Sequence, residues 1–339
     1  MKILPAEWAP QEMIQLTWPH EQTDWAPMMD EVNACFADIA RAVLRFQPLL
    51  IVCSDIKAVR SMLGEVDETR LRWAMLLSND TWARDHGGIT VFEDGKRVIY
   101  DFGFNGWGNK FEASFDNKIT NKLYLLGVFG SETAIRDCND FILEGGSIES
   151  DGAGTLLTTS NCLLAPGRNT VDRDTIEAKL KDYFGLERVL WINHGYLEGD
   201  DTDSHIDTLV RLCNKETIAY VQCTDPEDPH YEELQKMEAE VKALKQANGE
   251  PYKLIALPMA DAQYEDEDRL PATYANFLIL NGAVLVPTYA SPKDAQALAL
   301  LKKAFPDREV IGIDCRALIK QHGSLHCVTM QYPTLTPIQ

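Results

Sequence analysis

The sequence predicts an α/β protein in which five strand–strand–helix–strand units close into a ring with pseudo-fivefold symmetry. Two observations lead to this fold class. The same order of turn signals and apolar periodicity recurs along the 339 residues,. The final copy ends before its helix, and the missing pieces stand at the beginning of the chain. No linker or low-complexity tract divides the sequence, so we expect one domain over residues 1–339.

The repeat is clearest in the middle of the chain. Strands at residues 141–150 and 155–162 flank the turn Asp151-Gly152-Ala153-Gly154, which is a strong hairpin signal,. A helical pattern at 172–184 and a short apolar strand at 189–193 follow,. The order is repeated with strands at 205–212, 217–223 and 253–257 and a helix at 229–247, and again with strands at 274–280, 283–287 and 309–313 and a helix at 294–305. An earlier, less regular copy begins at Thr81, with strands at 89–92 and 97–102.

The last unit is completed by the other end of the chain. Residues 325–331 are predicted to form a strand, after which the sequence soon stops. The missing pieces are a strand at 13–18, a helix at 30–46 and a strand at 49–53,. Because a repeat that cannot bury its own apolar face buries it against its neighbours, we expect a closed ring with strands from both termini side by side.

Composition disfavours several classes of protein. With 45% hydrophobic residues the chain can bury a sizeable core,. A net charge of −20 argues against nucleic acid as a partner, because phosphate binding needs Lys and Arg,. No apolar run approaches the roughly 20 residues of a membrane helix, and the start MKILPAEWAP does not resemble a secretory signal,. The eight cysteines form no CxxC pair, which favours reduced thiols and a cytoplasmic protein.

Chemistry-bearing side chains fall near the start of the first predicted strand of each unit. In a ring with pseudo-fivefold symmetry, equivalent strand positions converge on one axis, so these side chains are expected to face one central pocket. His205 and Asp207 are two residues apart and would project from the same face of a strand,. The set comprises two acids, a His–Asp pair, an amide and a thiol, namely Asp85, Glu144, His205, Asp207, Asn276 and Cys327.

Each of these residues also has a simpler explanation. An acidic residue beside glycines is typical of a turn, and a His-x-Asp pair is often a satisfied polar contact. A cysteine in an apolar strand is usually an inert buried thiol. The shared position across five units is what favours a functional site.

Several stretches around these positions match a known family. They are Ala6-Glu7-Trp8, Thr17-Trp18-Pro19, 79–87, 143–148, 152–159, His205-Ile206-Asp207, Asn276-Phe277 and 325–329. In combination they resemble agmatine deiminases, within the pentein superfamily of guanidine-modifying enzymes. The likeness covers nearly the whole chain and implies the pentein fold, a five-bladed α/β propeller of ββαβ units.

Two positions depart from the pattern of agmatine deiminases. The family tends to have Gly-Gly-Asn before its Ile-His-Cys segment, whereas Gln321-His322-Gly323-Ser324-Leu325 precedes His326 here. Gly88 stands where proline is common. Because Cys327 is retained, these departures concern the local loop and the contacts with the far end of the substrate, and not the reaction class.

The resemblance implies hydrolysis of the guanidinium group of agmatine to N-carbamoylputrescine and ammonia, without a cofactor or a metal. Cys327 is then the nucleophile that forms a covalent thiouronium,. His205 is the general acid that protonates the departing ammonia and the general base that activates water. Glu144 is expected to orient the imidazole and to favour its cationic form.

Four residues are assigned to substrate binding, and the resemblance implies two of them. Asp85 and Asp207 are expected to accept hydrogen bonds from the planar guanidinium in a bidentate manner. Trp82 is expected to lie against the guanidinium or its alkyl stem. Asn276 is expected to be no more than a polar contact in the pocket wall.

Other functions remain open at this stage. Arginine and peptidylarginine deiminases share the chemistry, although the net charge of −20 favours agmatine with its second cation,. A metal site could use His205, Asp207, His326, Cys327 and Asp85, but these residues lack paired zinc spacing. The acidic stretch 199–204 lacks the glycine and the closing glutamate of an EF-hand,. A non-enzymatic binding module on the same fold is disfavoured because the polar set is complete. Residues 263–269 are expected to be a solvated loop, with a pocket lid as the alternative, and family members are often homodimers.

Overall fold

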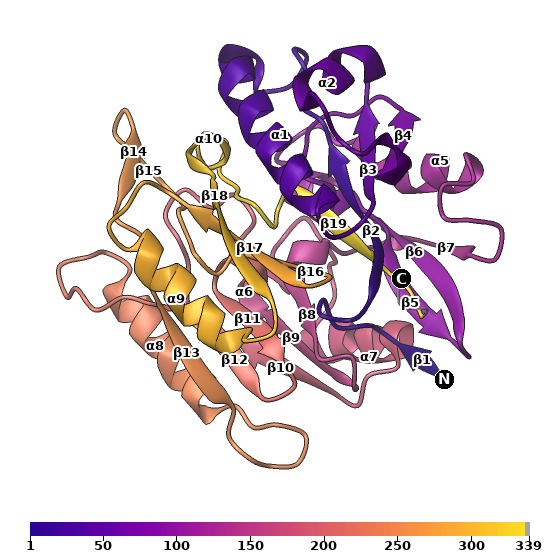
Figure 1. The fold of residues 1–339 in the computed structure, drawn as a ribbon. Coiled ribbons are helices and arrows are strands. Elements are labelled where there is room, and N and C mark those ends of the chain that lie inside the picture. Colours follow the sequence, from indigo (N-terminus) through magenta and orange to yellow (C-terminus); the bar gives the residue numbers. More distant parts are fainter. Residues whose placement is uncertain (336–339) are drawn as a thin grey trace.

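Five sheets of the structure repeat one strand order. The computed structural model describes residues 1–335. In each of these sheets an antiparallel pair of strands is followed by helical segments and a third strand that runs parallel to the second. The predicted order of elements is therefore found in all five units, and the protein has a mixed α/β fold with several small sheets (Figure 1).

Four of the units follow one another along the chain. The first comprises β5 (Ile89–Glu93), β6 (Lys96–Gly103), α4 (Gly106–Asn109), α5 (Ile119–Leu125) and β7 (Ala134–Ile142). The second comprises β8 (Ile148–Ser150), β9 (Thr155–Thr159), α6 (Ser160–Leu163), α7 (Arg173–Phe184) and β10 (Arg188–Ile192). The third comprises β11 (Val210–Asn214), β12 (Thr217–Gln222), α8 (Tyr231–Ala243) and β13 (Lys253–Pro258). The fourth comprises β16 (Leu278–Leu280), β17 (Ala283–Thr288), α9 (Asp294–Ala304) and β18 (Glu309–Asp314), with α10 (Arg316–Ile319) after it.

Both ends of the chain contribute to the fifth unit. Strand β19 (Thr329–Pro333) pairs antiparallel with β2 (Gln11–Thr17), and β2 pairs parallel with β3 (Leu49–Cys53) after helix α1 (Met29–Leu44). Figure 1 shows the yellow strand β19 beside the indigo strand β2. The predicted pairing of strands from the two termini is confirmed, with Leu16 opposite Thr329.

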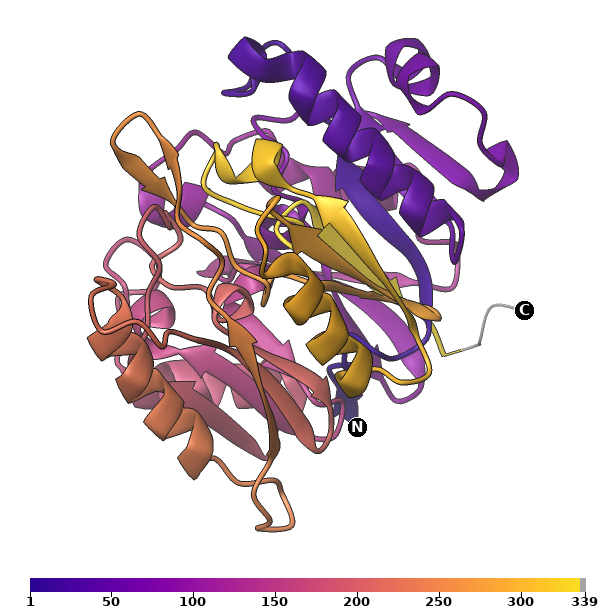
Figure 2. The ribbon, with the colours of Figure 1, turned by 60° about the vertical axis from the view of Figure 1, so that its left-hand side comes forward.

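Several elements outside these units were not predicted. Strand β1 (Lys2–Ile3) pairs with β5, and helix α2 (Ile56–Leu63) leads to β4 (Leu71–Met75), which pairs with β3. Residues 263–269, expected to be a solvated loop, instead lie in a hairpin of β14 (Gln263–Glu265) and β15 (Asp268–Leu270). This hairpin projects from the body of the molecule in both ribbon views (Figures 1 and 2).

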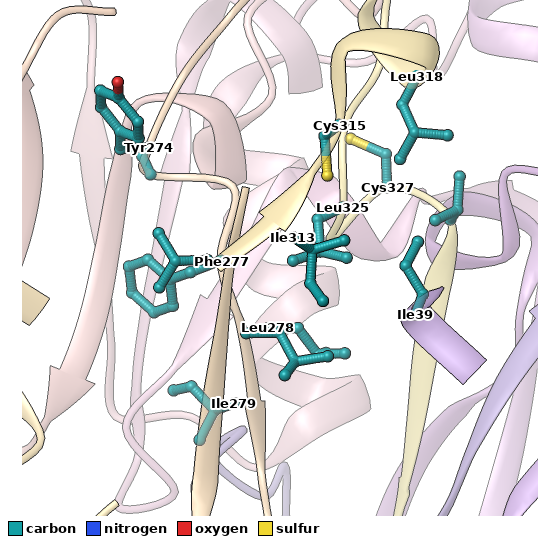
Figure 3. Packing of buried hydrophobic residues seen from close by; sticks show 14 of the residues in the cluster. Ile39, Tyr274, Phe277, Leu278, Ile279, Ile313, Cys315, Leu318, Leu325 and Cys327 are labelled. Carbon is teal, nitrogen blue, oxygen red and sulfur yellow. The ribbon is translucent and has the colours of Figure 1, made fainter. Parts of the chain in front are cut away.

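Helix α1 illustrates how the helices cover the sheets. Its predicted apolar positions Val32, Phe36, Ile39 and Val43 are all 0% exposed, because residues three and four apart lie on one face of a helix. This face belongs to the largest cluster of buried apolar residues, which also contains Cys327 (Figure 3). Figure 2 shows the long helices on the outside of the sheets.

Local signals account for the boundaries of helix α7. The Asp172 carboxylate accepts a hydrogen bond from the Thr175 backbone N–H at 2.9 Å and so caps the first turn,. The helix ends at Gly185, whose φ of 67° is the left-handed conformation that glycine adopts without strain,. These short-range contacts explain why the helical pattern at 172–184 was a sound prediction.

The segments that carry the predicted polar residues are turns and not strands. The first strands of the last four units begin at Ile148, Val210, Leu278 and Thr329. The prediction that His205 and Asp207 lie on a strand is therefore wrong, since residues 206–208 form a 3-10 turn. Thr208 closes this turn, because both its hydroxyl (2.8 Å) and its N–H (3.2 Å) donate to the His205 carbonyl,. The equivalent segments are the one-turn helix α3 (Ala83–His86) before β5 and the 3-10 turn Gly145–Ser147 before β8.

Among residues 1–335, no helix combines the length and the apolar character that a bilayer span requires,.

Candidate active site

The turns that precede the first strands bring the predicted polar residues together. Gly146 marks their meeting point: a Cβ built there would lie 2.6 Å from His205 Nδ1, 2.8 Å from Asp85 Oδ1 and 3.1 Å from Asp207 Oδ2. Residues from three units thus converge around one backbone position. Any side chain at position 146 would displace them, so glycine is needed for this close approach.

The Asp85 carboxylate is held by neighbours on both oxygens. Oδ1 accepts a hydrogen bond from Gly146 N at 3.1 Å and faces His205 Nδ1 at 3.6 Å. Oδ2 accepts a hydrogen bond from Trp107 Nε1 at 3.0 Å. Burial, and to a smaller extent the Asp207 charge, raises the pKa of Asp85 to about 6, although the His205 imidazole acts in the opposite direction,.

Asp207 is fully buried and has one occupied oxygen. Oδ2 accepts a hydrogen bond from His326 Nδ1 at 2.8 Å, whereas Oδ1 has no hydrogen-bond partner among the described residues. Burial alone would raise the pKa of Asp207, but the hydrogen bond and the charge of His326 lower it below its ordinary value,. Oδ1 is therefore a buried carboxylate oxygen that could accept a further hydrogen bond.

The imidazole of His205 lies between carboxylates and a thiol. Besides its 3.6 Å contact with Asp85, it lies within 4.8 Å of the Glu144 carboxylate and of the Cys162 thiol. Burial opposes a positive charge here, yet the neighbouring Asp85, followed by Cys162 and Glu144, raises the pKa of His205 well above its ordinary value,. The imidazolium is therefore the favoured form near neutral pH.

Glu144 is engaged by an arginine that the sequence did not point to. Its Oε1 accepts a hydrogen bond from Arg168 Nε at 2.8 Å, and both side chains are fully buried. Arg168 Nη1 also forms an ion pair with Asp203 Oδ2, at 2.5 Å. No hydrogen bond joins Glu144 to His205 within residues 1–335, and Glu144 Oε2 has no partner there. Glu144 acts on His205 through its charge.

Cys327 lies in the turn before β19 and not in the strand itself. Its Sγ–H donates to Asn276 Oδ1 at 3.4 Å, and the same oxygen accepts a hydrogen bond from His326 N at 2.9 Å. Burial, followed by the charges of Asp207 and Asp85, raises the pKa of the Cys327 thiol well above its ordinary value,. Burial and the two negative charges together favour the neutral thiol.

A cavity of about 170 Å³ opens beside Cys327 and Asp85. The rings of Trp82, Trp107 and Phe111 line it. The position of Trp82 depends on a glycine opposite, because a Cβ on Gly323 would lie 2.1 Å from the indole ring. Of the six polar residues expected to face one pocket, Asp85 and Cys327 line this cavity, and the other four do not: Glu144, His205, Asp207 and Asn276. Asn276 lies behind Cys327.

The wall of this cavity is acidic. Besides Asp85 it contains four carboxylates, and within the described part of the chain it contains no Lys or Arg. The four are Asp24, Asp80, Asp200 and Asp201. Burial raises the pKa of Asp201, and the nearby His322 acts against this rise. His322, at one of the departures from the agmatine deiminase pattern, also lines the cavity and donates from Nδ1 to the Gly199 carbonyl at 2.8 Å.

Comparison with known proteins places the chain in a family. The sequence model of the Porphyromonas-type peptidyl-arginine deiminase family matches residues 3–333. The chain belongs to this family. Within that relationship, an agmatine deiminase from Pseudomonas aeruginosa (strain LESB58) is 32% identical over 356 residues, which cover 97% of this chain and 95% of that protein.

Two solved structures are similar to this chain over almost their full lengths. A candidate arginine deiminase from Porphyromonas gingivalis is 56% identical, with a TM-score of 0.95 and 98% of both chains covered. A Cys-to-Ser form of the C. jejuni agmatine deiminase with substrate bound is 38% identical, with a TM-score of 0.92 and 98% of this chain and 97% of that chain covered. The predicted relationship to agmatine deiminases is confirmed, and the chain is a hydrolase of C–N bonds in guanidine or amidine groups.

Four residues that contact the predicted site residues were not assigned a catalytic or binding role from the sequence: Trp107, Cys162, Arg168 and His326. His326 carried a signal, since it precedes Cys327 within the matching stretch 325–329. Trp107 and Arg168 carried none, because they reach Asp85 and Glu144 from loops of other sequence regions. Such contacts depend on the tertiary arrangement alone.

The structure offers little to a metal ion. Among residues 1–335 one group of possible ligands, Glu144, Cys162 and His205, places its ligand atoms within 4.8 Å of one another. The buried Arg168 guanidinium on Glu144 disfavours a cation at this place,. Asp200, part of the stretch that was compared with a calcium loop, instead accepts hydrogen bonds from Ser204 N (2.7 Å) and other groups of its own loop.

Proposed function

We propose that the protein hydrolyses the guanidinium group of agmatine to N-carbamoylputrescine and ammonia through a covalent cysteine thiouronium. The observation that carries the choice of substrate is the charge of the cavity wall, which contains four carboxylates besides Asp85 and no Lys or Arg among the described residues. Agmatine ends in a second cation, which such a wall attracts. The α-carboxylate of free arginine would be repelled by the same wall.

Arginine and peptidylarginine are the alternative substrates. They are suggested by the description of the family and by the Porphyromonas gingivalis relative. Neither compound offers an isolated primary ammonium to the carboxylates of the wall, and free arginine requires a cation that the wall lacks. The geometry therefore supports agmatine over both.

Asp85 and Asp207 are proposed to hold the guanidinium. They approach each other at Gly146, and Asp207 Oδ1 has no partner among the described residues. A guanidinium presents N–H donors in a planar fork that suits two carboxylates. The indole of Trp82 in the cavity wall supports its proposed contact with the planar cation or its alkyl stem,.

Cys327 is proposed as the nucleophile, and substrate binding as the event that activates it. The charges of Asp207 and Asp85 oppose the thiolate. A guanidinium bound between these carboxylates neutralises them beside the sulfur, so the thiol loses its proton to water more readily. The thiolate then attacks the central guanidinium carbon and forms a tetrahedral adduct.

His205 is proposed to move the protons. As an imidazolium it protonates one nitrogen of the adduct, the C–N bond breaks, and ammonia leaves a thiouronium on Cys327. The neutral imidazole then takes a proton from a water molecule whose oxygen adds to the thiouronium carbon. Collapse of this second adduct breaks the C–S bond and releases the urea product. The Glu144 charge favours the imidazolium in the first step.

The arrangement of the sheets supports a proposal about the fold of the whole chain. Five sheets with one strand order, and the pairing of β19 with β2, support a five-bladed α/β propeller of the pentein type. We propose one catalytic domain over residues 1–339, of which 336–339 lie outside the described residues. A cytoplasmic location and a homodimer stay predictions from the sequence.

Product analysis tests the proposed reaction. Incubation with agmatine is expected to give N-carbamoylputrescine and one equivalent of ammonia, detected by mass spectrometry and by a coupled ammonia assay. Cys327→Ala is expected to give neither product. Formation of putrescine and urea would contradict the reaction, because it reports cleavage of the other type of C–N bond.

A further inference from the structure

His326 has a carboxylate at each ring nitrogen. Nδ1 lies 2.8 Å from Asp207 Oδ2, and Nε2 lies 2.8 Å from Glu7 Oε2. Both contacts are buried. An ionised carboxylate only accepts hydrogen bonds, so Nδ1 donates to Asp207. Nε2 also lies 3.2 Å from Arg211 Nη2, which can only donate, so Nε2 has both an acceptor and a donor beside it,.

Glu7 is itself fixed by the core of the protein. Its Oε1 accepts a hydrogen bond from Ile279 N at 2.7 Å, and its Oε2 accepts one from Arg211 Nη2 at 2.7 Å. Arg211 is fully buried and also binds Glu149. The guanidinium of Arg211 donates to the Phe277 carbonyl at 2.5 Å as well. The imidazole of His326 is therefore attached to a rigid, charge-paired network and not to a mobile side chain.

The contact with His326 determines what Asp207 presents to a ligand. Oδ2 is occupied by His326 Nδ1, and Oδ1 is the oxygen without a partner in the described part of the chain. A carboxylate held at one oxygen cannot rotate freely, so the direction of Oδ1 is fixed before a guanidinium arrives. The chain position of His326, directly before Cys327, couples this carboxylate to the turn that carries the nucleophile.

We propose that His326 is a positioning residue that holds the Asp207 carboxylate, by its Nδ1–H, in the orientation that accepts the substrate guanidinium. The proposal rests on the proposed function and deepens it, because it assigns the residue that prepares the second substrate carboxylate. The N-terminal segment takes part through Glu7, which lies 319 positions before His326 in the sequence.

The proposal also predicts a change in pH dependence. The titratable and charged groups that face Asp207 are His326, His205, Arg211, Arg84, Asp85 and Cys327. Burial raises the pKa of Asp207, and His326 provides the leading contributions that lower it. Without His326, Asp207 takes up a proton at higher pH. Because Asp85 already sets the start of the acid limb of kcat/KM at about pH 6, the expected change is that the limb steepens at a higher pH.

Two substitutions separate the two nitrogens of His326. Asparagine places an amide N–H near the position of Nδ1, and glutamine places one near the position of Nε2. In a Cys327→Ala background, His326→Gln is expected to weaken agmatine binding about 10- to 100-fold, as is typical when a hydrogen bond to a charged group is lost. His326→Asn is expected to bind more tightly than His326→Gln. With Cys327 present, the same order is expected for KM, and the acid limb of His326→Gln should steepen at a higher pH than that of the wild type.

His230→Gln is the matched control. His230 is buried with a partner at each ring nitrogen, Asp228 at 2.7 Å and the Glu198 N–H at 2.8 Å, but it takes no part in the site. Its substitution should leave agmatine binding and the pH profile unchanged. Equal binding by His326→Gln and His326→Asn, or an acid limb of the same shape in His326→Gln and the wild type, would overturn the proposal.

Failure of this inference is distinct from failure of the proposed function. If the wild-type protein releases no ammonia from agmatine, the proposed function is wrong. If the wild type is active and His326→Gln binds agmatine as tightly as the wild type does, only the inference about His326 is wrong. If a variant fails to fold, ¹⁵N NMR of the wild-type histidines decides. A proton on Nδ1 of His326 supports the proposal, and a tautomer without that proton overturns it.

Discussion

Trp107 donates its indole N–H to Asp85 Oδ2 at 3.0 Å from a backbone conformation with a φ of 56°. A bulky residue in this left-handed region costs on the order of 1–3 kcal/mol, so the surrounding structure must hold it there. Phe104 and Trp82 pack against the indole, with ring centroids 5.1 and 6.5 Å away. The strained turn thus fixes one oxygen of the Asp85 carboxylate, which we propose binds the substrate.

The first prediction concerns pH. Burial is the main cause that raises the pKa of Asp85 to about 6, and the protonated carboxyl group no longer attracts a guanidinium. We therefore expect kcat/KM for agmatine to fall as the pH decreases through about 6. Trp107→Phe removes a hydrogen bond that favours the ionised carboxylate, so its acid limb should lie at higher pH. An acid limb that does not respond to this substitution would contradict the assigned role of Trp107.

The second prediction concerns the nucleophile. Cys327→Ala should reduce turnover by at least about a thousandfold without loss of the folded state. Cys53→Ala removes a thiol of β3 that is 3% exposed and serves as the control, with activity retained. A cationic haloacetamidine should label Cys327 faster than neutral iodoacetamide does, because Asp85 and Asp207 attract the cation. Preferential labelling of another cysteine, accompanied by loss of activity, would overturn the assignment.

The third prediction concerns the acidic cavity wall. Asp201→Asn should raise KM for agmatine roughly 10- to 100-fold, because it removes a charged partner of the distal ammonium. Butylguanidine lacks this ammonium, so its KM should not respond to the substitution. Asp307→Asn alters an exposed carboxylate outside the cavity and should leave both substrates unaffected. Equal effects of Asp201→Asn on agmatine and butylguanidine would show that Asp201 does not bind the distal group.

The fourth prediction concerns metals. The proposed reaction uses no Lewis acid, since the substrate already carries the positive charge that attracts the nucleophile. Prolonged dialysis against EDTA should therefore leave the rate unchanged. Loss of activity that one particular metal ion restores would bring back a metal-dependent mechanism.

Local signals in the sequence were sufficient for most of the fold. The turn at Asp151-Gly152-Ala153-Gly154 separates β8 from β9 as predicted, and β3 spans the predicted residues 49–53. Helix α2 and strand β4 were missed, although they extend the sheet of the fifth unit. The turns before the first strands were also missed, because side-chain contacts such as Thr208 with the His205 carbonyl override the apolar pattern of a strand,.

The candidate site could be predicted only in part. The repeat positions and motifs predicted Asp85, His205 and Asp207 as site residues, and the structure places them around Gly146. The environment of each group could not be predicted, because it depends on residues far away in the sequence. Arg168 donates a hydrogen bond to Glu144, which was expected to orient the His205 imidazole. Only the folded chain reveals such competition between partners.

The central claim is that the enzyme acts on agmatine, and relative kcat/KM values test it most directly. Ammonia release is measured with agmatine, free arginine and an N-blocked arginine amide under identical conditions. The account predicts at least about a hundredfold preference for agmatine, which corresponds to roughly 2.7 kcal/mol of discrimination in the transition state. Comparable or faster release from either arginine compound would contradict the assignment of agmatine as the substrate.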